Sequence, residues 1–99
     1  MIRSDFDGAA LIDSAGERIG TVERTFVDDN GNPRFLKVRM GHLPPRHRLV
    51  PAEQAETEDD GVRVPYLRDV IEESPPAAMD DNLSGDELTR IQEYYASDV

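Results

Sequence analysis

The stretches RIGTVERTFVD at residues 18–28 and RFLKVRM at residues 34–40 decide the fold of this chain. Both are rich in β-branched and aromatic residues, which predicts two strands. The sequence DNGNP at residues 29–33 separates them, and its Asn-Gly pair readily takes the positive φ of a tight hairpin turn. We therefore expect a hairpin, in which Gly20 marks a bulge or a close approach of another backbone.

The two faces of the second strand differ. Every second side chain from Leu36 to Met40 is aliphatic, so we expect this side to face the core, whereas Lys37 and Arg39 lie on the other side. In the first strand Arg24 breaks the simple alternation of inward and outward side chains. We expect either a bulge there or an Arg24 side chain that leaves the protein at the end of a barrel.

Other strand-like runs extend the pattern along the chain. They are short, are bounded by turn residues, and comprise residues 9–13, 48–51 and 62–67. Short strands spaced in this way predict a mainly β protein, either a small barrel or a sandwich, with about five to six short antiparallel strands. Residues 53–61 are interpreted as an acidic loop, and residues 67–73 fit either a further strand or a helical turn.

A C-terminal α-helix is expected. Ser84 to Glu87 matches the capping box, in which the Ser and Glu side chains satisfy each other's free backbone N–H groups. The apolar stripe at helical spacing consists of Leu88, Ile91, Tyr94 and Tyr95. An isolated helix of about a dozen residues is marginal in water. We therefore divide the chain into a β domain, residues 1–76, and a C-terminal extension, residues 77–99, whose helix docks on the barrel or on a second subunit.

The chain is strongly acidic, and the charge is unevenly placed. Its 99 residues carry a formal net charge of −10, with +1 in residues 1–50 and −11 in residues 51–99. This balance disfavours binding to a phosphate backbone, so we do not expect a nucleic-acid partner. One small core favours oligomerisation, and we expect a homodimer with a further protein partner. No apolar run is long enough to span a bilayer, so we expect a cytoplasmic protein without membrane insertion.

No recognisable catalytic or metal-binding motif is present. The chain has no cysteine, and His42 and His47 flank a Pro-Pro loop without a third ligand nearby in the sequence. The acidic residues from Glu56 to Asp60 lack the alternating pattern of a calcium loop and are interpreted as a solvated surface. We assign no catalytic, cofactor-binding or metal-binding residue and expect a non-enzymatic protein. A ligand or proton-handling role of the two histidines is the weaker alternative.

Two tyrosines and three arginines are the candidate residues for a protein interface. Tyr94 and Tyr95 are adjacent and cannot both point fully in the same direction, so we expect one of them to meet a partner. Arginine forms paired hydrogen bonds with carboxylates, which suits contacts within or between chains. Arg39, Arg46 and Arg48 lie in the less acidic half of the sequence and are therefore candidates to bind an acidic surface.

Several short motifs resemble the PRC-barrel family. They are Leu11-Ile12-Asp13, Gly16 to Val22, Asp28-Asp29, Phe35 to Val38, Leu49-Val50-Pro51 and Val62 to Tyr66. The tail from Asn82 to Tyr95 resembles an extension found in bacterial stress-associated PRC-barrel proteins. The family also includes the cytoplasmic domain of the photosynthetic reaction-centre H subunit and the C-terminal domain of a ribosome maturation factor. The resemblance implies a small barrel, frequent self-association and a scaffold role, without common catalytic residues.

The residues and the resemblance together lead to one leading hypothesis. We expect a PRC-type barrel that acts as a stress-associated interaction or scaffold module and docks a protein through an exposed strand edge or the tyrosine-bearing helix. The alternative is an RNA- or ribosome-associated factor. Its basic residues would be Arg34, Lys37, Arg39, Arg46 and Arg48.

Overall fold

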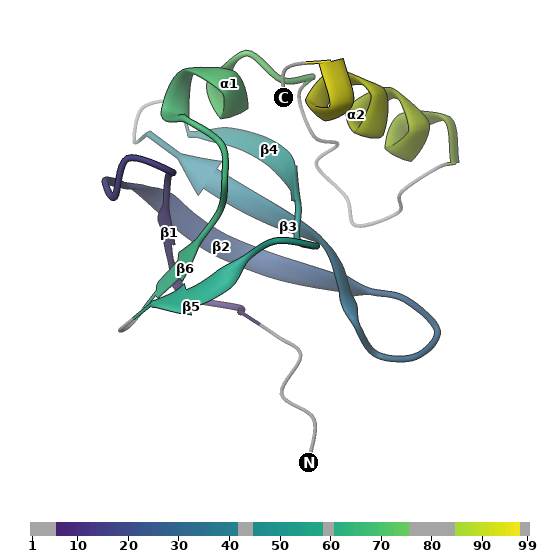
Figure 1. Ribbon diagram of the computed structural model, residues 1–99, viewed down its shortest axis with the longest axis horizontal. Coiled ribbons are helices and arrows are strands. Elements are labelled where there is room, and N and C mark those ends of the chain that lie inside the picture. The colour runs from purple at the N-terminus through teal and green to yellow at the C-terminus, as the bar shows by residue number, and fades with distance from the viewer. Residues whose placement is uncertain (1–5, 42–44, 59–60, 76–84, 98–99) are drawn as a thin grey trace.

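The computed structural model describes residues 6–41, 45–58, 61–75 and 85–97. Within them, six strands form one sheet and two helices lie against it (Figure 1). The strands are β1 (Ala10–Ile12), β2 (Arg18–Val27), β3 (Pro33–Met40), β4 (Arg46–Pro51), β5 (Glu56–Glu58) and β6 (Gly61–Arg63). The helices are α1 (Arg68–Glu72) and α2 (Gly85–Ser97). The mainly β class with a C-terminal helix is confirmed.

The β2–β3 hairpin forms as the sequence predicted. In its turn, Oδ1 of Asp28 accepts the backbone N–H groups of Asn30 and Asn32, both at 2.9 Å. Both bonds favour the charged carboxylate and so lower the pKa of Asp28, and the bond from Asn32 has the larger effect. The pairing of the two strands shifts between Val22 and Arg24, so a bulge accommodates the broken alternation and Arg24 is exposed.

Gly20 lies where β2 passes very close to β3. A Cβ atom at this position would be 2.5 Å from the carbonyl oxygen of Arg39, which no side chain could tolerate without a backbone shift. The predicted close backbone approach is therefore confirmed. On β3 the aliphatic side faces the core as expected, but Phe35 and Lys37 on the other side are also buried. The middle of β3 is thus covered on both faces.

The sheet is open rather than closed into a cylinder. Its strand order is β4-β3-β2-β1-β6-β5, and neighbouring strands are antiparallel except for β1 and β6. These two run parallel, with Leu11 opposite Val62. The expectation that the strands are antiparallel is corrected at this pair. The chain reaches β6 only after four intervening strands, and local sequence patterns do not encode the direction of so distant a neighbour.

Several of the predicted boundaries change. The strand predicted at residues 48–51 begins at Arg46, so Arg46 and His47 belong to β4. Residues 53–61 do not form only a loop, because β5 lies within them and pairs with β6 as a hairpin. The last predicted strand ends at Arg63 instead of residue 67, and the chain then enters α1. Pro65 explains the early end, since it has no N–H group to donate to a neighbouring strand. The undecided segment at residues 67–73 is therefore a helical turn.

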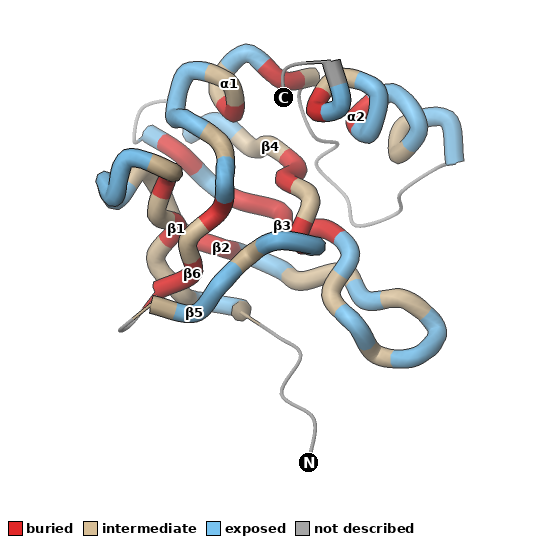
Figure 2. The backbone as a smooth tube through the Cα atoms, viewed as in Figure 1, coloured by how far each residue is buried: buried red, intermediate tan, exposed pale blue. Residues whose placement is uncertain are grey.

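The hydrophobic core lies inside the curl of the sheet, where buried residues of most strands meet (Figure 2). Every strand except β5 contributes at least one buried apolar side chain, and each helix adds to them. The core residues are Leu11, Val22, Phe35, Leu36, Val38, Met40, Leu49, Val50, Ala52, Val62, Val64, Ile71, Ile91 and Tyr95. Burial of this apolar surface is the main source of stability.

Helices α1 and α2 lie on the same side of the molecule and both contact β4 (Figure 1). In α2, Ile91 and Tyr95 are buried, which confirms that the predicted apolar stripe covers the sheet. The Tyr95 ring lies 4.6 Å from the Tyr66 ring and 5.1 Å from the Tyr94 ring, measured between centroids. These three tyrosines attach α2 to the β domain. Ser84, the first residue of the predicted capping box, lies outside the described residues.

The hydroxyl group of Tyr95 is buried without a hydrogen-bond partner among the described residues. Ser74 is close enough to influence it, but the Ser74 hydroxyl donates to the Ile71 carbonyl oxygen at 2.7 Å, and no bond between Ser74 and Tyr95 meets the usual geometry. Burial raises the pKa of Tyr95 well above its ordinary value of 10.0. The phenol is therefore held in its neutral form.

The turn between β1 and β2 is joined to the start of α1 by the side chain of Asp13. This residue is only 2% exposed. Its Oδ1 accepts the N–H groups of Ala15 at 3.0 Å and Glu17 at 2.9 Å, and its Oδ2 accepts the N–H group of Arg68 at 3.3 Å. Arg68 is the first residue of α1, whose preceding residue, Leu67, supplies no side-chain cap. Asp13 therefore caps a helix that is distant in sequence.

Replacing Asp13 tests this connection. We expect Asp13→Ala to lower the free energy of unfolding by roughly 2 kcal/mol, because three partly buried N–H groups lose a charged acceptor. Asp13→Asn keeps one acceptor oxygen and should lose less. Urea denaturation followed by circular dichroism measures both, with Glu17→Gln on the same turn as the control. An Asp13→Ala protein as stable as the control would contradict the role.

Burial of the Tyr95 hydroxyl, which has no partner among the described residues, makes the stability of the protein depend on pH in the alkaline range. Because the pKa of Tyr95 is raised in the folded protein, its phenol ionises at a lower pH in the unfolded chain than in the folded one. The free energy of unfolding is therefore unaffected by Tyr95 ionisation below about pH 10, and it falls as the pH rises from there through the folded-state pKa. Tyr95→Phe should be at least as stable as the parent at neutral pH and lose less stability in alkali. Tyr95→Ala should lose about 3 kcal/mol through the missing ring. Parallel alkaline losses in parent and Tyr95→Phe would disprove the assignment.

Candidate functional site

The two outer strands of the sheet differ in what covers them. β4 contacts both helices, and Arg48 on this strand is bound to the end of α1. At the other end of the sheet, β5 pairs with β6 on one side and with no other strand of the described residues on the other. Glu56 and Thr57 are exposed, and most of β5 is pale blue in Figure 2. An outer strand of this kind presents unpaired backbone N–H and C=O groups.

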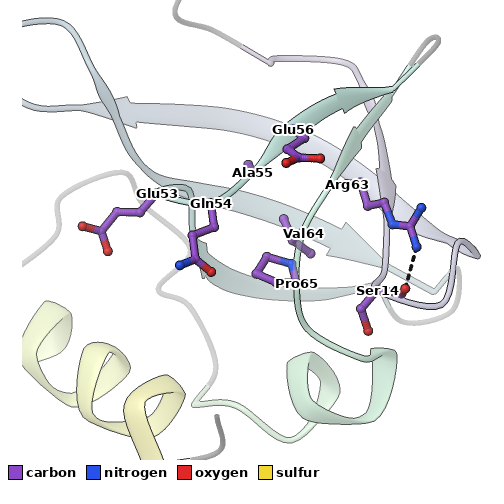
Figure 3. Close-up of a pocket in the computed structure, with 8 residues that line it drawn as sticks. All are labelled: Ser14, Glu53, Gln54, Ala55, Glu56, Arg63, Val64 and Pro65. Atoms are coloured by element: carbon purple, nitrogen blue, oxygen red, sulfur yellow. Dashed lines mark hydrogen bonds between the residues drawn. The ribbon is translucent and has the colours of Figure 1, made fainter.

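A groove of about 520 Å³ runs beside β5, and we call it the β5 groove (Figure 3). The segment that links β4 to β5, the end of β6 and the β1–β2 turn form its walls. Its lining residues are Ser14, Glu53, Gln54, Ala55, Glu56, Arg63, Val64 and Pro65. The groove therefore combines a few apolar surfaces with two carboxylates and one guanidinium group.

Arg63 is held in place at one wall of the β5 groove. Its Nη2 donates to the Ser14 carbonyl oxygen at 2.7 Å, the bond drawn in Figure 3. Its Nη1 donates to Oε2 of Glu58 at 3.2 Å. In contrast, the carboxylates of Glu53 and Glu56 have no hydrogen bond or ion pair to other described residues. The groove thus offers two carboxylates to solvent, and its own cation is already engaged.

A second groove, the α2 groove, meets the first at Glu53 and Gln54. It has a volume of about 320 Å³ and lies between α2 and the adjoining ends of β3 and β4. Its lining residues are Arg34, Phe35, Pro51, Glu53, Gln54, Tyr66, Gln92, Tyr95 and Ala96. Burial first, and the charge of Glu53 second, raise the pKa of Tyr66. The two grooves give a recessed surface that continues from the β5 edge toward α2.

The arginines predicted to form an interface do not share one face of the sheet. Arg46 and Arg48 lie opposite Met40 and Val38 of β3, whereas Arg39 lies opposite His47 and therefore on the other face. The Arg48 guanidinium binds the Glu72 carbonyl oxygen through Nε at 3.3 Å and Nη2 at 3.2 Å. Arg48 therefore holds α1 against β4, while Arg46 is exposed.

The remaining basic residues are also separated from one another. Arg39 is 3.9 Å from the carboxylate of Glu23, measured from Nε to Oε2. Lys37 is 6% exposed, whereas Arg34 is exposed. The five basic residues of the RNA alternative are thus spread over both faces of β3 and β4 and do not form one phosphate-binding surface.

Tyr94 and Tyr95 both face the protein's own β domain. Tyr95 is 2% exposed, and the half-buried Tyr94 donates its hydroxyl hydrogen to the Val70 carbonyl oxygen. The structure therefore uses both tyrosines to attach α2. A contact of Tyr94 or Tyr95 with a partner stays a prediction.

The histidines and acidic residues do not converge on a metal site within the described part of the chain. The structure there holds no group of three or more His, Asp or Glu side chains that could bind a metal ion. Nε2 of His47 lies 3.2 Å from Oε1 of Glu23. His42, Asp59 and Asp60 are outside the described residues. In the same part of the chain, no helix has the length and apolar character needed to cross a membrane.

The comparison with known proteins identifies the family. The family model of the PRC-barrel domain matches residues 1–71, which include all six strands and most of α1. The chain belongs to the PRC-barrel family. Its open, curled sheet agrees with this family, and PRC-barrel domains in general are protein-interaction modules. A search of curated proteins found no match.

Strand β5 and its groove are not predicted by the sequence patterns. Residues 53–61 are predicted to form a loop because their acidic residues outnumber their apolar ones. Two signals could have identified the strand: Thr57 lies between two glutamates in a period-two pattern, and Gly61 follows at hairpin distance. The groove itself has no local signal, since Ser14 and Arg63 lie far apart in the sequence.

The structural role of Arg48 can be separated from an interface role. We expect Arg48→Met to lower the free energy of unfolding by about 1 to 2 kcal/mol, because the Glu72 carbonyl loses a charged donor. The matched variant Arg46→Met changes an exposed arginine on the same strand and face, and should change stability by less than about 0.5 kcal/mol. Urea denaturation measures both. Equal stabilities would show that Arg48 does not hold α1.

Proposed function

We propose that this PRC-barrel protein is a non-enzymatic interaction module whose docking surface is the outer edge of β5 together with the β5 groove. Family membership supports an interaction module in general. The single observation that supports this surface is that β4, at one end of the sheet, contacts both helices, whereas β5, at the other end, has no neighbouring strand beyond β6 in the described part of the chain. Addition of an extended segment to an open edge satisfies its backbone groups and is a common mode of peptide recognition.

The residues around β5 hold it as a fixed strand edge, which suits docking better than the tip of a loop would. The edge is fixed from behind by the β5–β6 hairpin and by the Arg63 bonds to Ser14 and Glu58. The groove beside it offers side-chain space that a flat edge would lack. A rigid edge loses little conformational entropy when a partner strand binds, which favours affinity.

We also propose that the protein self-associates as a homodimer, works in the cytoplasm and has a stress-associated role. The small core supports self-association, since 99 residues bury limited apolar surface. The resemblance of the C-terminal tail supports the stress-associated role. Identification of the physiological partner, from cells grown with and without osmotic challenge, tests the last proposal.

A photo-crosslinking experiment tests the docking surface. A benzoylphenylalanine residue at Thr57, in the exposed β5 edge, should form a specific cross-link to a protein in native cells. The matched position is Asn30, which is also exposed but lies in the β2–β3 turn. We expect the cross-link from position 57 and not from position 30. Identical patterns from both positions would contradict docking at β5.

The homodimer has its own measurement. Light scattering over a wide range of protein concentrations should give twice the monomer mass of 11.1 kDa. A mass that stays at the monomer value at every concentration would disprove self-association, without affecting the docking surface at β5.

A further inference from the structure

The open edge of β5 is lined by carboxylates. Glu56 and Glu58 are two residues apart on the strand and therefore share a face, and Glu53 lines the adjoining β5 groove together with Glu56. Glu58 is paired with Arg63 at 3.2 Å. Glu53 and Glu56 have no ion pair with another described residue. A strand that adds to this edge therefore passes two carboxylates that make no ion pair with a described residue, although Arg63 lies opposite Glu56 on β6.

A second copy of this chain does not fit the edge. Antiparallel pairing of two β5 strands about Thr57 would set Glu56 of one copy opposite Glu58 of the other, and like charges directly opposite destabilise a pair. The two copies would also each carry a net charge of −10. Short, charged outer strands are a common protection against such self-pairing. Self-association therefore has to use another surface.

We propose that the β5 edge binds an extended protein segment that carries Lys or Arg at alternate positions. This inference rests on the proposed function and specifies the chemistry of its partner. Alternation is required because side chains of a strand point to opposite faces in turn, so residues two apart reach the same face. Basic side chains on the groove face meet Glu53 and Glu56, while the intervening residues point to the opposite face.

The two parts of this contact have different tasks. The backbone ladder along β5 provides affinity that is independent of the partner's side chains. The carboxylates select the partner by charge and speed its approach. Since both carboxylates are near solvent, each is worth little by itself, and their effect falls as salt screens them. The structure therefore predicts a moderate affinity that weakens with salt and depends on the position of the charges.

Three labelled peptides test the proposal with the full chain. Each has about nine residues, and their sequences alternate valine with lysine, with threonine or with glutamate. Fluorescence anisotropy at low salt should show the tightest binding for the lysine peptide. Two further versions of that peptide carry N-methyl groups on the backbone nitrogen of every lysine or on the backbone nitrogen of every valine. Each version removes the donors of one strand edge, so one should bind and the other should not.

Matched charge variants test the site. The double variant Glu53→Gln/Glu56→Gln should bind the lysine peptide about tenfold more weakly, and each single variant about threefold more weakly. The control Asp29→Asn/Asp86→Asn has the same net charge but changes two exposed carboxylates that lie in the β2–β3 turn and in the first turn of α2. It should bind like the parent. Circular dichroism confirms that each variant is folded.

The outcomes separate this inference from the proposed function. Equal binding of all three peptides, unaffected by the double variant, would overturn the basic partner but support docking at the β5 edge. Equal weakening by both double variants, or equal binding of both N-methylated peptides, would reveal diffuse attraction and overturn the inference. If none of the peptides binds, the inference of a basic partner is also overturned. Docking at the β5 edge would then be tested only by the cross-link from position 57.

Discussion

The arrangement of the strands and helices depends on the hydrogen bonds that the Asp13 carboxylate accepts. It is buried and accepts N–H groups from its own turn and from the first residue of α1. Arg63 binds the neighbouring Ser14 carbonyl oxygen, so β6 is attached to the same turn. A buried carboxylate is costly unless it is fully bonded, which makes this turn intolerant of other arrangements. The turn thereby holds β1, β6 and α1 together.

Attachment of α1 decides which edge of the sheet is covered. Because α1 follows β6 directly, it carries the chain back over the sheet to β4, where Arg48 binds its last carbonyl group. The tyrosine cluster then places α2 beside it. Both helices are thereby used on the β4 side, and β5 is left without a cover among the described residues. The open edge is thus a consequence of the packing, and the carboxylates beside it define the partners that it can accept.

Much of the fold could be predicted from the sequence, because its signals are local. The β2–β3 turn and the apolar stripe of α2 depend on residues within a few positions of one another, and Gly20 is recognisable as a glycine inside a strand-like run. The candidate site could not be predicted in the same way. Arg46 and Arg48 are equivalent in the sequence, yet one is exposed and the other binds α1. The difference arises from a contact with a residue far along the chain, for which local patterns contain no signal.

The sequence by itself determined the mainly β class, the C-terminal helix and the excess of negative charge, because periodicity, turn residues and composition act locally and survive in any arrangement of the strands. Tertiary structure decided the parallel pairing of β1 with β6, the burial of Tyr95, the contact of Tyr94 with α1 and the choice of the uncovered edge. Each of these depends on which distant surfaces bury the most apolar area while Asp13 stays bonded; burial of the Tyr95 ring takes place although its hydroxyl finds no partner among the described residues.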